Sequence, residues 1–446
     1  MLCIEKATKL GDMLRAFRLE PLNDSMFSKF YYNNTMPIRT GDECSSPLED
    51  LFDECTTPLS KNAHLLMGHG GCGKSTELFR LKQRFDQSGH PTCIIDFMAE
   101  TDSQRANRWD IMLLITEGLC KVIDERKLSV KKDILTAILN YLKRDEVKTN
   151  DAIILREIGA AGGVEAKTPA ILKGLLNVFA SIKFDLKANA STRTLITEKM
   201  EKRASEWISY IKEISDNVII GLNGLQPILV FENLDKMQPP DKALEILRYP
   251  YLSEMPFPII YTFPISLYYD PSFAFVKNNY IAHTLPMIKV SNEDKSDNVG
   301  GIGVIREIVK LRADINLFDD DALDLLIKQT GGVLRDLFEC IITAARRANR
   351  RGSDKIEMED SKLALSGLGE ELSRQISIPD NEKLINIYNN PKYREQIEDL
   401  RFLLDKMQAL VVLEYRNGKR WHNLHPMIAE FLIKQGVIEI DGKKRH

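Results

Sequence analysis

The sequence predicts an α/β fold in which helices cover both faces of a five-stranded, mainly parallel sheet. Three observations support this prediction. Short apolar runs alternate with helical patterns through the first 290 residues. Two of these runs, at 228–231 and 259–262, are continuously apolar, as in strands buried on both faces. A third apolar run, at 64–67, is joined to a helical pattern by a loop that contains four glycines.

The first 60 residues are expected to be loop-rich. Clusters of Pro, Asn, Asp and Thr surround short apolar pieces, and one piece, beginning at Pro47, looks like the start of a helix. The core then occupies residues 61–290. Helical patterns at 75–89 and 109–125 separate its first strands, and such alternation implies parallel pairing. Core strands are expected at 64–67, 93–97, 228–231, 259–262 and 280–285.

A largely helical insertion interrupts the core at about 128–222. Helical patterns cover 131–142 and 195–214. Between them, the run 182–186 alternates apolar and polar residues and has the period of a strand. The insertion is therefore expected to be helical with one short strand.

The C-terminal part of the chain divides into two smaller units. Ser, Asn, Asp and Gly make 291–301 a suitable linker, and the helical patterns after it predict a domain at 301–370, which we call the lid. In residues 381–446, two helical patterns precede two strand-like runs joined by Asn417–Gly418, and a last helix begins at Pro426. This order is typical of a winged-helix domain.

Composition places few limits on partners or compartment. The 61 Lys and Arg against 64 Asp and Glu give a net charge of −3, so any basic surface must be local. The seven cysteines form no close pair and no zinc-finger spacing, which favours reduced thiols and a cytoplasmic protein. The N-terminus lacks an apolar signal core, and the apolar run 259–269 is too short to span a bilayer, so no membrane partner is expected.

The glycine loop carries the clearest chemical signal. Residues 68–75 match the phosphate-binding loop (P-loop) pattern GxxxxGK[ST] between a strand and a helix. Backbone N–H groups of such a loop turn toward the phosphates, Lys74 bridges the phosphates, and the Ser75 hydroxyl ligates Mg²⁺. We therefore expect ATP and Mg²⁺ as cofactors. The expected nucleotide-binding residues are Gly68, His69, Gly70, Gly71, Cys72, Gly73, Lys74, Ser75, Thr76 and, from the lid, Arg335.

An acidic element follows the strand at 228–231. Glu232 ends this strand at the edge where the nucleotide is expected, so it is placed to hold Mg²⁺. The next residue is Asn233, which can orient the attacking water but cannot accept its proton. Either Glu232 or Asp235 supplies the base, or hydrolysis is slow and the protein dwells in its ATP-bound state.

Two further residues are candidates for contact with the phosphates. Thr262 ends the next strand and can place a hydroxyl near the γ-phosphate, although Thr is also commonplace at strand ends. Arg335 follows the pair Gly331–Gly332 at the start of a lid helix, from which its guanidinium can reach the nucleotide. The alternative is an Arg335 paired with acids on the surface of the lid. The candidate catalytic residues are Glu232, Asn233, Asp235 and Thr262.

Together these elements resemble the AAA+ ATPases, in particular the origin-recognition-type initiators and the signal-transduction ATPases called STAND. The resemblance covers roughly residues 60–370 and rests on the loop at 68–75, a Walker B-like element at 228–235, a sensor-1-like Thr262 and a sensor-2-like Arg335. Both branches commonly carry a C-terminal winged helix. The resemblance implies a five-stranded αβα P-loop core with a helical lid, ATP between them, and an oligomer in which a neighbour supplies an arginine finger.

Three functions are compatible with the sequence. The first is a slowly hydrolysing ATP-driven switch that assembles and regulates a partner effector. A role in anti-phage defence is implied for it because the insertion looks like that of prokaryotic ATPases near mobile-element and phage-defence systems. The second is an origin-recognition-like ATPase that binds DNA through the winged helix. The third is a near-inactive ATPase that acts as a scaffold.

Two local basic clusters are the candidates for contact with nucleic acid. Arg346, Arg347, Arg350 and Arg351 come after the lid helix, and Arg416, Lys419 and Arg420 surround the Asn417–Gly418 turn. Cations at these places can contact phosphates, which would make binding salt-dependent. Charged helix ends and hairpin tips are also commonly just solvated.

Overall fold

In the computed structural model, a parallel sheet forms the centre of the molecule. The structure describes residues 5–57, 61–143, 168–188, 190–390 and 400–439. The sheet has five strands in the order β2-β3-β4-β1-β5, and every neighbouring pair is parallel, which confirms the predicted fold class. The strands are β1 (Ala63–Gly68), β2 (Thr92–Asp96), β3 (Ile228–Glu232), β4 (Ile259–Pro264) and β5 (Ile281–Thr284).

Both faces of the sheet are buried, which explains the continuous apolar runs. Leu65 and Met67 of β1 pack with helix α7 (Arg108–Arg126) on one face. Leu66, between them, points to the other face and packs with α4 (Pro47–Thr56) and α5 (Lys74–Gln87). Because the strands are parallel, their carboxyl ends meet at one edge, where Gly68 pairs with Pro264 and Asp96 with Glu232.

The segment before the sheet is predicted to be loop-rich, but in the structure it contains several helices. Short helices α1 (Met13–Ala16), α2 (Asp24–Phe30) and α3 (Met36–Thr40) precede α4. The segment crosses from the core to the lid. Helix α1 packs on α17 of the lid (Leu334–Arg350), and α2 contacts both α5 and α15 (Val299–Arg312). Helix α3 contacts strand β6 (Val412–Asn417) of the C-terminal unit. The first residues therefore join the other parts of the molecule.

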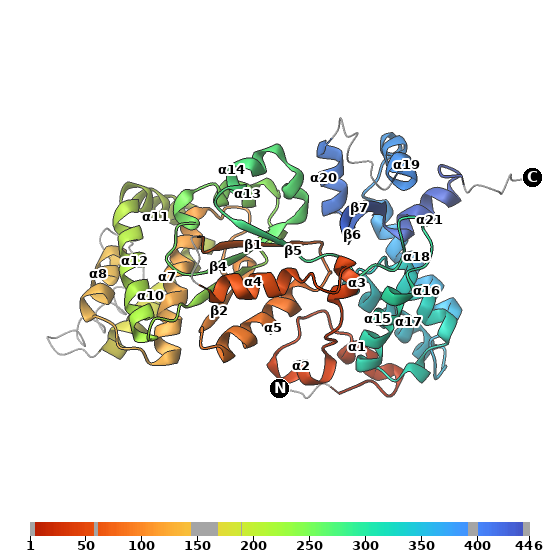
Figure 1. The fold of residues 1–446 in the computed structure, drawn as a ribbon, viewed down its shortest axis with the longest axis horizontal. Helices are drawn as coiled ribbons and strands as arrows, with labels where there is room; N and C mark the ends of the chain where they lie inside the picture. The colour runs from red at the N-terminus through yellow and green to blue at the C-terminus, as the bar shows by residue number, and fades with distance from the viewer. Residues whose placement is uncertain (1–4, 58–60, 144–167, 189, 391–399, 440–446) are drawn as a thin grey trace, which may run out of the picture.

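The insertion is helical in its described residues. It comprises α8 (Lys132–Lys143), α10 (Thr168–Ala188), α11 (Ala190–Lys202) and α12 (Ala204–Gly221), which stack against α7 at one end of the sheet (Figure 1). The strand suggested at 182–186 is wrong, because these residues belong to α10. Phe179 and Leu186, seven apart, are buried, whereas Phe184 is 71% exposed, so the helical period decides which side chains face the core.

The lid lies at the opposite end of the sheet from the insertion (Figure 1). It contains α15, α16 (Asp320–Gln329), α17 and α18 (Met358–Ser373). The predicted linker 291–301 is wrong in its last residues, because α15 begins at Val299, where the Asn298 side chain accepts a hydrogen bond from Gly301 N–H as a helix cap.

The C-terminal unit has the predicted order of elements. Helices α19 (Asn381–Asn389) and α20 (Leu400–Gln408) precede the antiparallel hairpin β6 (Val412–Asn417) and β7 (Lys419–Leu424), and α21 (Pro426–Lys434) follows. The chain turns at Gly418, whose φ is +66°. Its assignment as a winged helix stays a prediction.

The remaining helices are short. They are α6 (Phe97–Glu100), α13 (Asp241–Leu247) and α14 (Ala274–Lys277), with 3₁₀ turns at Leu10–Asp12, Leu234–Lys236, Pro250–Leu252, Ile265–Tyr269, Pro271–Phe273, Ile315–Leu317 and Ile378–Asp380. None of the helices in the described ranges is long and apolar enough to cross a bilayer.

Candidate functional site

The glycine loop lies between β1 and α5, at the carboxyl edge of the sheet. Gly71 has φ +76° and Gly73 has φ +104°, a left-handed backbone that glycine adopts without strain. Gly73 is the N-cap of α5 and offers no side chain to the first N–H groups of the helix. The helix therefore presents uncapped amides and its positive end at the loop, as an anion-binding site requires.

The lid approaches this loop closely. A Cβ on Gly71 would lie 2.9 Å from the Cβ of Arg335 and 2.9 Å from Val333, so only glycine fits between the loop and the start of α17. A Cβ on Gly70 would lie 3.7 Å from the Arg335 guanidinium. The structure thus brings the predicted lid arginine to the P-loop.

Lys74 is a buried cation with three partners. Its ammonium donates to the carbonyls of Gly68 (2.8 Å) and His69 (3.0 Å) and lies 2.9 Å from the Asp235 carboxylate. Burial opposes the charge on each group, but their attraction prevails, so the pKa of Lys74 is raised and that of Asp235 is lowered. Both residues are therefore charged at neutral pH.

Glu232 lies beside Ser75, as expected of a pair that shares a metal ion. Burial raises the pKa of Glu232, the Ser75 hydroxyl opposes this rise through a hydrogen bond, and the nearby Asp96 carboxylate adds to it. A divalent cation would offset both the cost of burying this charged acid and its repulsion from Asp96. The donor set of one hydroxyl and two carboxylates fits Mg²⁺. Sequence analysis missed Asp96, although an acid at the end of an apolar strand was its available signal.

The turn after β3 determines where Asp235 points. Asn233 has φ +65°, and the Thr262 hydroxyl accepts hydrogen bonds from the N–H groups of Leu234 (3.0 Å) and Asp235 (3.4 Å). The same hydroxyl donates to the Phe231 carbonyl at 3.3 Å. Thr262 therefore holds the turn that directs Asp235 toward Lys74, in addition to lining the site.

A cavity of about 840 Å³ contains this site. Besides Lys74, Ser75, Thr76 and the acids above, it is lined by Arg18, Tyr31, Tyr32 and Arg39 of the N-terminal segment and by Met407, Gln408 and Leu410 near the end of α20. The site is thus built from the core, the N-terminal segment, the lid and the C-terminal unit together.

Arg39 is a site residue that sequence analysis missed. It is 2% exposed and donates to the carbonyls of Cys72 (2.9 Å) and Pro286 (2.5 Å), which joins the P-loop to the segment after β5. Tyr31 lies close by and donates to Glu77 of α5 at 2.7 Å. Neither residue belongs to a recognisable sequence motif. Packing between segments that are distant in the sequence brings both of them to the site.

His69 connects the P-loop to the C-terminal hairpin. Its Nε2 accepts a hydrogen bond of 2.8 Å from the backbone N–H of Glu414 in β6. Burial lowers the pKa of His69 to about 4, so the ring is neutral and can act as an acceptor. The next residue, Tyr415, donates its hydroxyl to the Gly331 carbonyl of the lid at 2.7 Å. One strand therefore bonds both to the loop and to the lid.

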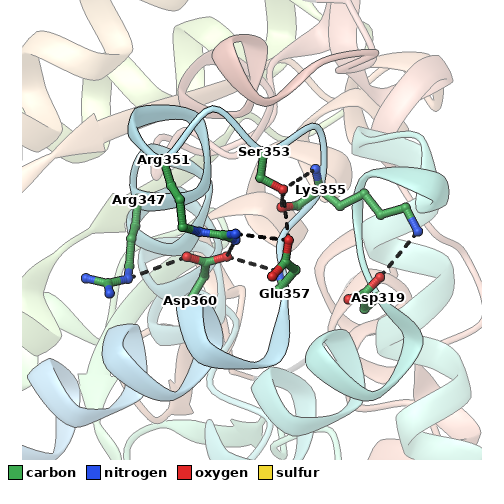
Figure 2. A network of polar contacts seen from close by, with 7 residues as sticks. All are labelled: Asp319, Arg347, Arg351, Ser353, Lys355, Glu357 and Asp360. Carbon is green, nitrogen blue, oxygen red and sulfur yellow. Dashed lines mark hydrogen bonds and ion pairs between the residues drawn. The ribbon is translucent and has the colours of Figure 1, made fainter.

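Some cations of the two basic clusters form contacts within the molecule. In the lid, Arg351 lies 2.8 Å and Arg347 3.5 Å from the buried Asp360, within a network that includes Glu357 (Figure 2). In the hairpin, the Arg420 guanidinium lies over the ring of Tyr268, 4.6 Å from its centroid. The exposed cations Arg346, Arg350 and Lys419 lie outside these networks.

Gly332→Ala is expected to destabilise the junction between lid and core. Gly332 has φ +83°, and a Cβ there would lie 1.9 Å from the Ile288 carbonyl oxygen. Left-handed strain and the clash together should lower the free energy of unfolding by about 3 kcal/mol. The matched control is Gly352→Ala, since Gly352 has φ +77° but no atom within 4 Å of its Cβ position. Urea unfolding of both variants measures the difference, and equal losses would contradict the close packing.

Comparisons with known proteins gave matches among solved structures. No protein-family model matches the chain, and no curated protein matches it. The chain is similar at 13% identity to the ORC1 protein of Aeropyrum pernix in complex with DNA, over 88% of this chain and 92% of that one, with a TM-score of 0.37. Cdc6p of Pyrobaculum aerophilum matches at 13% identity over 94% and 99%, with a TM-score of 0.36. The ORC2 protein of Aeropyrum pernix, in ADPNP–ADP complexes, matches at 13% identity over 89% and 96%, with a TM-score of 0.37.

Proposed function

We propose that this protein is an ATP-binding molecular switch of the AAA+/STAND type, in which the nucleotide site controls the C-terminal unit and, through it, a partner effector. The observation that carries the proposal is the hydrogen bond from Glu414 N–H to His69 of the P-loop. A loop that holds phosphate and also bonds to a distant domain can transmit nucleotide occupancy to that domain.

Binding would use groups that converge on the cavity. The loop amides and Lys74 would hold the phosphates, while Ser75 and Glu232, with Asp96 nearby, would hold Mg²⁺. Arg335 would contact the phosphates from the lid. Mg²⁺ would supply charge neutralisation at the phosphate oxygens.

Hydrolysis is proposed to be slow. The residue after Glu232 is Asn233, which has no proton acceptor of sufficient basicity. Asp235, the alternative base, is bound to Lys74 at 2.9 Å, and this ion pair lowers its basicity. A protein with these acids would spend most of its time with ATP bound, which suits a switch.

The switch would act on other chains. We propose that ATP-bound molecules form homo-oligomers or bind a partner effector in the cytoplasm, and that the effector serves anti-phage defence. The resemblance of the loop, lid and insertion to STAND-type and phage-defence ATPases motivates this part of the proposal.

The coupling is tested by hydrogen exchange and particle size. A slowly hydrolysed ATP analogue should slow amide exchange several-fold in residues 412–424 and increase particle size, because the loop and lid that bond to the hairpin become fixed. In His69→Ala the analogue should still bind within about 10-fold of the wild-type affinity, but the slowing should disappear. Lys74→Ala should bind no analogue and show neither effect.

The matched control for this test is His90→Ala. His90 is also buried and hydrogen-bonded, to the Gln226 carbonyl, but it lies outside the cavity. This variant should respond to the analogue as wild type does. If bound analogue leaves exchange in the wild-type hairpin unchanged, or if His69→Ala still responds, the proposed coupling is wrong.

The rate of phosphate release tests the role of Asn233. Asn233→Glu should raise a low wild-type rate at least about 10-fold, because it supplies a general base. Asn233→Gly keeps the left-handed turn at φ +65° without a carboxylate and should not raise the rate. A brisk wild-type rate would contradict slow hydrolysis, and a brisk rate that survives in Asp235→Asn would also exclude Asp235 as the base. If no variant releases phosphate, but the ATP analogue still changes hydrogen exchange and particle size, the scaffold function is favoured.

DNA binding is the second candidate function. The exposed Arg346 and Arg350 of α17 and Lys419 of the hairpin favour it. We rank it lower because the hairpin turn is packed on α3: Gly418 N–H donates to the Thr40 carbonyl at 3.1 Å, and Lys289 donates to the Arg416 carbonyl at 2.6 Å. The turn is thus held within the molecule.

Duplex binding across a salt series tests this second function. If it holds, ATP-dependent binding should weaken steeply with salt and fall at least several-fold in Arg346→Ala/Arg350→Ala. Lys434→Ala, which removes a cation paired with Glu430 in α21, is the control. Absence of binding at low salt in the presence of ATP would eliminate the function.

A further inference from the structure

Three side chains from distant parts of the chain converge at the β5 edge of the sheet, away from the P-loop. They are Glu54 of α4, His64 of β1 and His283 of β5. Leu66 lies opposite His283 in the parallel pairing, so His64 and His283 project to the same face of the sheet, where α4 covers them. The two rings and the carboxylate thus meet beneath one helix.

Their ligand atoms form a compact triangle. His283 Nε2 lies 3.0 Å from Glu54 Oε2, His64 Nδ1 lies 3.5 Å from the same oxygen, and the two ring nitrogens are 3.4 Å apart. In a tetrahedral zinc site with bonds of about 2.0–2.1 Å, ligand atoms are about 3.3 Å apart. The three atoms therefore already have the spacing that one Zn²⁺ ion imposes.

Hydrogen bonds within this cluster, such as the one between His64 Nδ1 and His283 Nε2, leave some of its polar atoms without a partner. Glu54 Oε2 and His64 Nε2 are buried and have no hydrogen-bond partner. His283 Nε2 faces both His64 Nδ1 and the Glu54 carboxylate. A proton can be shared between two of these atoms, whereas one metal ion can bind all three at once.

The environment supplies the two imidazoles in the form that binds metal, whereas burial, together with the nearby Asp50 carboxylate, raises the pKa of Glu54. His64 is fully buried and His283 is 5% exposed. Burial lowers the pKa of His64 to about 3 and that of His283 to about 4, so both rings are neutral. Asp50, one helical turn before Glu54, adds negative charge to the same region. The cluster is thus favourable for a divalent cation.

We propose that Glu54, His64 and His283 bind one Zn²⁺ ion that joins α4 to the edge of the sheet. Two imidazoles and a carboxylate suit Zn²⁺ better than Mg²⁺, which prefers oxygen ligands. The Glu54 side chain is 30% exposed, so water can reach the fourth position from this side.

Zinc binding to the untagged full-length chain tests the proposal. After treatment with EDTA and without nucleotide, the protein should take up one Zn²⁺ per chain, measured by elemental analysis and by competition with a chromophoric chelator. Glu54→Gln should weaken binding at least 10-fold, because it removes a charged ligand at a partly exposed position without creating a cavity. His283→Gln should do the same, provided that its circular dichroism spectrum remains that of the wild type.

Asp53→Asn is the matched control, since Asp53 is an exposed carboxylate next to Glu54 on the same helix. This variant should keep the wild-type affinity. Zn²⁺ should also raise the Tm of the wild type and of Asp53→Asn but not that of Glu54→Gln. Lys74→Ala should bind Zn²⁺ normally, so failure of the nucleotide switch leaves this result unaffected. Uptake well below one ion per chain, or equal affinity in Glu54→Gln and Asp53→Asn, would overturn the site.

Discussion

The charge on Lys74 is the constraint around which the nucleotide site is built. A buried ammonium group is stable only when other groups neutralise it, and removal of one partner from such a pair costs about 3–5 kcal/mol. The partner, Asp235, lies in the 3₁₀ turn after β3. It reaches Lys74 because Asn233 has a left-handed backbone and the Thr262 hydroxyl, from β4, holds the turn. One ion pair therefore requires the carboxyl ends of β1, β3 and β4 to lie together, and the parallel sheet provides this arrangement.

A second consequence follows from the small size of the loop residues. Gly71 allows the start of α17 to approach the loop to van der Waals distance, and Gly332 allows the same segment to pass the Ile288 carbonyl. The lid can then present Arg335 at the loop while the Gly331 carbonyl bonds to Tyr415. Loop, lid and hairpin are therefore so closely packed that a change in one of them must be accommodated by the others.

The sequence was sufficient to predict features that depend on local pattern. The strands around 228–231 and 259–262, the loop at 68–75 and the lid helix that carries Arg335 each have a period, a spacing or a motif that short-range physics imposes. Arg39 and His69, as a link to Glu414, have no such signal, because their partners lie 33 and 345 residues away. In the Glu54 cluster, His283 is likewise far from Glu54 and His64 in the sequence. At 182–186 a local pattern was present but gave a wrong prediction. Apolar and polar residues do alternate there, but burial of Phe179 and Leu186 on one side of α10 favours a helix over a strand.

The proposed zinc site and the nucleotide site lie at opposite ends of one short strand. His64 is near the beginning of β1 and Gly68 is its last residue, and the strand between them is completely buried. Helix α4 also packs on α5, where the Phe52 and Phe85 rings stack with centroids 5.1 Å apart and Arg84 forms a double hydrogen bond with Glu49. Because α5 begins at Lys74, a metal that fixes α4 on the edge strand β5 would support both the strand before the P-loop and the helix after it. Such an ion would preorganise the phosphate site without contacting nucleotide.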